Sequence, residues 1–185
     1  GARWMLTPTN QMLFPGDQLR TLNNSRVWLL WSDSSVVNFG ELTLVEILPA
    51  QDRDSLPGLQ MLRGLLSFFH RDKPGRIRVV TRGTTAGVEG TEFVLAVDAT
   101  DNQERARLSV IDGRVQLSNE QGTLLLTNYQ QGVAELGKAP ARTAGFIANN
   151  ILQWCLYYPA VLDPDELQLS TDEAQALKES LAAYR

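Results

Sequence analysis

The feature that most constrains the fold is the regular return of turn residues between short apolar runs, from residue 18 to residue 136. Residues 26–31 follow the turn pair Asn23 and Asn24, and residues 36–39 follow a polar turn at residues 33–35. Strand and turn signals recur about every eight to ten residues, which is typical of sandwiches and barrels. The pattern therefore predicts an all-β region of many short antiparallel strands.

The sharpest local signal is the pair Asp112 and Gly113, which stands between two alternating runs within residues 107–118. A type I′ turn needs positive φ at both central residues, and Asp-Gly is favoured there. A hairpin closed at this pair would place Val110 opposite Val115 and bring the apolar side chains of both runs to one face. The sequence therefore predicts a β-hairpin over residues 107–118.

Residues 90–97 have the pattern of a central strand. Gly90 permits a tight turn or a bulge, and Phe93, Leu95 and Val97 share one face. The two residues between them are also apolar, which is typical of a strand buried on both faces. We expect Glu92 to lie near an edge or to accept hydrogen bonds. In residues 59–69 apolar side chains fit both the helical and the strand periodicity, so a short helix and a pair of strands remain alternatives there.

The pattern changes after residue 137. Residues 143–158 lose the alternation and place Ile147, Ile151 and Trp154 on one helical stripe. Ser170 and Glu173 form a capping box that begins a second amphipathic helix, which is still amphipathic where the chain stops. We expect a β domain over residues 1–137 and a helical tail over residues 138–185, leading into a helical region that follows.

Composition excludes several classes of function. Among the 185 residues, Lys+Arg number 17 and Asp+Glu 21, and the formal charge of −4 argues against a dedicated nucleic-acid binder. The single cysteine excludes an internal disulfide, and the single histidine, His70, excludes zinc sites built from several histidines. No apolar run is long enough for a membrane-spanning helix. We predict no catalytic residue, no cofactor and no metal.

An ordered set of motifs resembles the FecR domain, the periplasmic domain of ferric-citrate-type transport regulators. Residues 15–21 resemble its early Gly-Asp-x-Leu-x-Thr segment, and residues 25–35 resemble its Ser-Arg hairpin. Residues 88–93 resemble its Val-x-Gly-Thr-Glu-Phe signature, and residues 110–115 its following hairpin. The set covers roughly residues 13 to 136, and the ordered combination is more specific than any one motif.

The resemblance implies a location and a wider organisation. It implies an exported, periplasmic domain with a two-layer or solenoid-like β arrangement, although short strands with turns fit a sandwich as well. Residues 151–159 resemble the helical lead-in of FecR-domain proteins that continue into tetratricopeptide-like repeats. The expected function is a non-enzymatic interaction or sensing module of the cell envelope that binds a protein partner.

Basic residues cluster near residue 76, with Arg71, Lys73, Arg76, Arg78 and Arg82 close together in the chain. On a strand Arg76 and Arg78 would share one face, since side chains alternate. Such a cluster is either a solvated face or a patch that binds an acidic partner. We take the candidate interaction residues to be Arg76, Arg78, Arg82 and Glu92.

Two other functions remain open from the sequence. A carbohydrate- or peptidoglycan-binding module would need two of Trp28, Trp31, Phe39 and Tyr129 exposed and coplanar. Trp28 and Trp31 lie three apart, so on one strand they point to opposite faces, and core packing is the simpler interpretation.

The last-ranked alternative is a hydrolase that uses carboxylates. Such an enzyme would pair Glu89 with Glu92 or Asp98 across a cleft, and its two carboxyl groups would lie about 5–10 Å apart.

Overall fold

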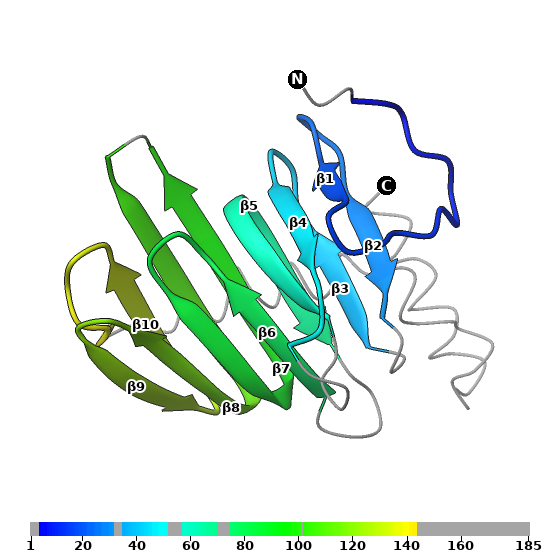
Figure 1. Ribbon diagram of the computed structural model, residues 1–185. Helices are drawn as coiled ribbons and strands as arrows, with labels where there is room; N and C mark the ends of the chain where they lie inside the picture. The colour runs from blue at the N-terminus through cyan, green and yellow to red at the C-terminus, as the bar shows by residue number, and fades with distance from the viewer. Residues whose placement is uncertain (1–3, 32–34, 52–56, 70–74, 101, 144–185) are drawn as a thin grey trace, which may run out of the picture. The chain divides into compact units, whose positions relative to one another are not determined.

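The computed structural model describes residues 4–31, 35–51, 57–69, 75–100 and 102–143, within the first of two compact units of the chain. These residues form one mixed sheet of eleven strands (Figure 1). The strands are β1 Gln18–Arg20, β2 Val27–Leu30, β3 Val36–Phe39, β4 Leu44–Leu48, β5 Gly58–Phe69, β6 Gly75–Val80, β7 Thr85–Ala99, β8 Glu104–Asn119, β9 Gly122–Thr127, β10 Gln130–Glu135 and β11 Ala141–Arg142. The predicted all-β class is confirmed here, whereas the helical tail lies outside the described residues. The described residues contain no helix that could cross a membrane.

The three long strands β5, β7 and β8 organise the sheet, because different parts of each one pair with different neighbouring strands. β7 pairs with β6 through residues 85–90 and with β5 through residues 92–97. β8 pairs with β7 along most of its length, while its two ends pair with β10 and β9. β5 also pairs with β6, in the parallel sense. β5, β6 and β7 thus close a barrel-like ring of pairings, and the other strands flank it.

One continuous apolar core lies on the inner face of these strands. Phe93, Leu95 and Val97 of β7 are buried in it, as the alternation predicts. The ring of Phe93 stacks on that of Phe68 from β5, with centroids 5.2 Å apart. β7 has strands on both sides, so the prediction of a central strand at residues 90–97 is confirmed.

β5 is a single bent strand, which is neither of the two alternatives left open for residues 59–69. Its residues 58–63 pair with β4 and its residues 66–69 pair with β3. The bend lies at Gly64, whose φ of +106° is unfavourable for other residues. Thr43 holds the bend, because its hydroxyl oxygen accepts a hydrogen bond from Leu65 N at 3.0 Å and lies 3.2 Å from Leu65 O.

The predicted hairpin at residues 107–118 is wrong, because β8 runs through this segment as one strand. Val110 pairs with Phe93 and Val115 pairs with Val88, so both flanks pair with β7 and not with each other. The predicted turn residues have other partners. The Gly113 N–H donates to Asn128 Oδ1 at 2.9 Å, and Asn128 Nδ2 donates to Asp112 Oδ1 at 2.8 Å.

Gly113 has a positive φ of +101°, but it lies within a strand and next to a register shift, not in a turn. The register between β7 and β8 shifts next to this position, on the β7 side between Gly90 and Phe93. An irregularity of this kind changes the direction in which the following side chains point. The apolar residues on both sides of Gly113 are therefore buried together, as predicted, although no hairpin brings them there.

Candidate functional site

Of the predicted basic residues, the structure describes the side chains of Arg78 and Arg82, which lie in different surroundings. Arg78 is half-buried, and its guanidinium lies against the backbone of Gly58 at the start of β5. Arg82 is exposed, and its Nη1 donates to Thr100 O at 3.1 Å. Arg76 lies on β6 opposite Glu89, and its side chain is outside the description. Arg71, Lys73 and His70 also lie outside the described residues.

Glu92 lies on β7 at the register shift, opposite Phe69 on one side and Asp112 on the other. Because strands pair on both sides of it, Glu92 is not at a sheet edge, and its side chain is half-buried. Asp98 lies nine positions beyond Glu89 on the same strand, which corresponds to about 30 Å. That separation is about three times the longest that a carboxylate pair for glycoside cleavage tolerates, and the side chain of Glu89, whose other proposed partner is Glu92, lies outside the description.

The aromatic residues considered for sugar stacking separate into two groups. Trp31 and Phe39 are buried, whereas Trp28 is 50% and Tyr129 69% exposed. The prediction of opposite faces for Trp28 and Trp31 is consistent with this, and core packing holds only for Trp31. Tyr129 N donates to Val110 O of β8, and β8 is separated from β2, the strand of Trp28, by β3, β5 and β7 along the hydrogen-bonded path. The two exposed rings therefore do not make one stacking platform.

A concavity of the described residues lies at one end of the sheet and has a volume of about 800 Å³. Its wall comes from the loop before β4, the bend of β5, the β7–β8 turn and the end of β10. It is lined by Leu42, Arg63, Gly64, Val97, Asp98, Ala99, Thr100, Asn102, Gln103, Glu104, Arg105, Glu135, Leu136 and Lys138. We call it the β7–β8 hollow. Its volume is in the range of ligand-binding sites.

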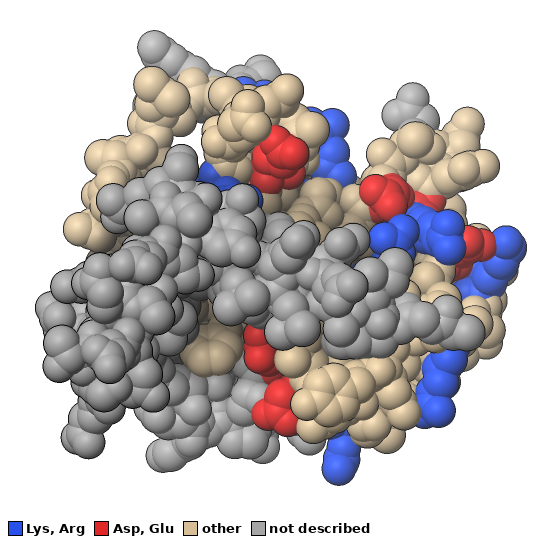
Figure 2. Space-filling model, turned by 180° about the vertical axis from the view of Figure 1, so that it is seen from behind, with Lys and Arg blue, Asp and Glu red and all other residues tan. Residues whose placement is uncertain are grey.

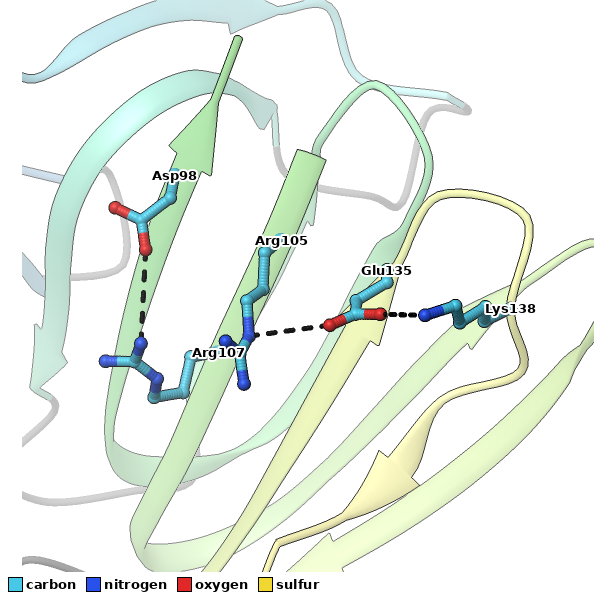
Figure 3. A network of polar contacts seen from close by, with 5 residues as sticks. All are labelled: Asp98, Arg105, Arg107, Glu135 and Lys138. Carbon is cyan, nitrogen blue, oxygen red and sulfur yellow. Dashed lines mark hydrogen bonds and ion pairs between the residues drawn. The ribbon is translucent and has the colours of Figure 1, made fainter. Parts of the chain in front are cut away.

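Four of the five residues in a polar network line this hollow (Figure 3). Glu135 of β10 lies between Lys138, whose Nζ is 2.6 Å from Oε2, and Arg105, whose Nε is 3.7 Å from Oε1. Arg107 pairs with Asp98 at 4.0 Å. The hydrogen bond and charge of Lys138, helped by Arg105, lower the pKa of Glu135.

Arg63 differs from the other cations that line the hollow. It is exposed on β5, and it forms no ion pair within the part of the chain that the structure describes. Figure 2 shows basic and acidic side chains lying next to each other and not separated by sign. The hollow therefore offers local charge contacts, with Arg63 as its available cation, instead of a field of one sign.

Sequence reasoning missed Glu104, which positions the rim of the hollow. This carboxylate is only 4% exposed and accepts hydrogen bonds from the Thr81 hydroxyl, from Arg82 N at 2.9 Å and from Gly83 N at 3.0 Å. The turn at residues 81–84 is thereby tied to the β7–β8 turn. Arg82 strengthens the same link through Thr100. A single Glu after a polar turn carries no pattern that distinguishes it from a solvated residue.

Comparison with known proteins identifies the β region. A family model described as FecR protein matches residues 17–116, which is more than half of the chain and runs from β1 into β8. No curated protein matches the chain.

Two solved structures share the fold. Both are crystal structures of a candidate anti-sigma factor from Parabacteroides distasonis ATCC 8503, at 1.65 and 2.50 Å resolution. Each aligns with a TM-score of 0.60 and 18% identity over 76% of this chain. The chain spans 65% and 64% of the length of those two chains.

Proposed function

The chain belongs to the FecR protein family, and from this premise we propose that it is a regulatory domain that binds a protein partner in the cell envelope. The family is non-enzymatic, as the sequence predicts. The similar solved protein is described as a candidate anti-sigma factor, which supports control of a sigma factor as the output. The proposed location is the periplasm, where domains of this family typically work.

The proposal of partner binding rests on the position of Arg63 in the β7–β8 hollow. An exposed guanidinium in the same hollow as Asn102 and Gln103 can bind a carboxylate, and the two amides can bind the backbone of a peptide segment. Leu42 and Leu136 are about half exposed and also line the hollow, so an apolar side chain can bind there too. An acidic residue next to an apolar one, on a protein segment, matches this combination.

The predicted residues Arg76, Arg78, Arg82 and Glu92 remain part of this proposal, Arg76 as a candidate contact on β6 and the other three as follows. Arg82 supports the rim of the hollow through Thr100, so we propose that it positions the β7–β8 turn. Arg78 and Glu92 are half-buried, and any partner contact they make would be peripheral. Glycan binding is not favoured, because the two exposed aromatic residues, Trp28 and Tyr129, belong to parts of the sheet that do not pair with each other.

We also propose the wider organisation that the resemblance implies. It comprises the two-layer packing of the folded sheet, a β domain over residues 1–137, a helical tail over residues 138–185 and tetratricopeptide-like repeats after it. Circular dichroism of residues 138–185 together with the natural continuation of the chain tests the helical part. A β-rich or unordered spectrum would contradict it.

The functional proposal is tested by cross-linking the full-length protein in its native envelope and identifying the attached molecules by mass spectrometry. We expect a stoichiometric protein partner whose yield falls about tenfold in Arg63→Glu, since charge reversal opposes an acidic segment. Arg114→Glu, an exposed arginine on β8 outside the hollow, is the matched control and should leave the yield unchanged. Attached glycan strands without a protein would support the carbohydrate-binding alternative instead.

A further inference from the structure

The segment 4–14 is the most exposed apolar part of the described chain. No charged residue occurs from Trp4 to Gly16. Leu6 is 99%, Met5 80% and Met12 69% exposed. Figure 1 shows this segment, in dark blue, as a wide loop outside the sheet. We call it the N-terminal loop. Exposed apolar side chains concentrated in one segment indicate an interaction site.

The N-terminal loop is held at both ends, so its middle is displayed in a defined place. At one end Asp17 N donates to Phe14 O at 2.9 Å and Phe14 N donates to Asp17 Oδ2 at 2.8 Å. Gly16, with φ of +93°, completes this turn. At the other end the Arg20 guanidinium lies 4.5 Å from the centre of the Trp4 ring. Both anchors belong to β1 or to the residue before it.

β1 presents an open edge beside these anchors. It pairs only with β4, among the described strands. Ile47 N donates to Asp17 O, and Thr21 N donates to Thr43 O. In an antiparallel ladder bonded and non-bonded pairs alternate, so the N–H and C=O groups of Gln18 and Arg20 point away from β4. No ladder joins residues 4–13 to this edge in the described part of the chain.

Among the described residues, an uncharged segment that pairs with no strand thus adjoins a strand edge that has no partner. We propose that two copies of this chain associate through this surface, and that the N-terminal loop of each copy pairs as an added strand with β1 of the other. In a dimer with a two-fold axis both contacts form at once, because each copy carries the N-terminal loop that is added and the β1 edge that receives it. The absence of charge from the loop means that neither copy must desolvate an ion there.

A protein edge suits this loop better than a lipid bilayer does. The backbone groups of an irregular segment find no partners among lipid tails, whereas a strand edge supplies them. Pairing would also cover Met5, Leu6 and Met12. Methionine side chains adapt readily to a new contact surface.

The test is the mass of the whole 185-residue chain in solution, measured by sedimentation equilibrium and light scattering over a wide range of concentration. We expect the mass of two chains for the natural sequence. The double variant Leu6→Asp with Met12→Asp should raise the dissociation constant by about a hundredfold, because burying a carboxylate opposes pairing. Leu125→Asp, at an exposed leucine of β9, is the matched control and should leave the dimer intact.

A second variant tests the acceptor edge independently of the loop. Gln18→Pro removes an N–H that points away from β4, so proline is tolerated there in the folded chain and blocks strand addition. It should give a folded monomer, checked by circular dichroism. A natural chain that stays monomeric at every concentration overturns the proposal, and so does a dimer that survives both variants. Neither result bears on the partner cross-linking test at Arg63.

Discussion

The buried carboxylate of Glu104 accepts a hydrogen bond of 3.0 Å from the backbone N–H of Gly83, which lies 21 positions earlier in the chain. This contact joins the turn before β7 to the turn after it. The same carboxylate also accepts from Thr81 and from Arg82, so one side chain satisfies three donors. The shape of the β7–β8 hollow therefore depends on a residue that need not touch a partner.

Replacing Glu104 by alanine should destabilise the domain by about 3 kcal/mol, because the donors at residues 81–83 lose a charged acceptor in a buried place. Urea unfolding of the purified chain measures the change. Glu120→Ala, at an exposed glutamate after β8, is the control and should change the free energy of unfolding by less than about 0.5 kcal/mol. Equal stability of the two variants would show that Glu104 does not hold the turns together.

Gly64→Ala should destabilise the domain by about 3 kcal/mol or more. The residue has positive φ, and an added Cβ would clash with the backbone and side chain of Thr43. Gly87→Ala is the matched control on β7, since a Cβ there meets nothing within 4 Å. It should be neutral or slightly stabilising. Thermal unfolding of both variants distinguishes a required bend from an incidental one.

The pKa of Glu135 should rise toward its usual value in Lys138→Gln, because Lys138 is the main cause of its lowering. An NMR pH titration of the Glu135 carboxyl group measures this directly. The lowered folded-state pKa means that the ion pair stabilises the fold above the usual carboxyl pKa. That contribution is lost as pH falls through the lowered value.

Arg107→Gln serves as the control for that titration. Arg107 pairs with Asp98 and does not contact Glu135, so the Glu135 titration curve should not move. Added salt should weaken the lowering in the natural chain, since Lys138 is exposed. An unchanged pKa in Lys138→Gln would mean that another group sets it.

Phe93→Ala should destabilise the domain by about 3–5 kcal/mol, because it removes a fully buried ring stacked on Phe68. Phe93→Leu should cost clearly less, as it keeps most of the apolar volume. Guanidinium unfolding gives both values. Val94→Ala, the next residue on the opposite face of β7, should have a smaller effect than Phe93→Ala. The reverse order would place the core on the other face of β7.

Much of the strand content could be predicted because alternation is a local property. The core face of β7 at Phe93, Leu95 and Val97 follows from side chains that alternate along any extended chain. The predicted hairpin at Asp112 and Gly113 failed for the opposite reason. A turn signal is local, but the flanking residues pair with β7, which lies far from them in the chain.

The candidate site was even less accessible to sequence reasoning. Arg63 lies in residues 59–69, where the apolar pattern fits a helix as well as strands. Glu104 has no motif around it. The basic cluster near Arg76 was visible because its members are neighbours in the chain. The hollow instead joins Arg63, Arg105 and Lys138, which only the sheet brings together.

The sequence by itself determined the β class, the family and the inner face of the central strand, since these depend on composition, periodicity and motif order. The tertiary structure decided which strands pair, why Gly113 serves a register shift instead of a turn, and where Glu104 and Arg63 lie. Strand pairing and burial are set by the competition of distant segments for the same hydrogen bonds and the same core, and that competition leaves no local pattern in the sequence.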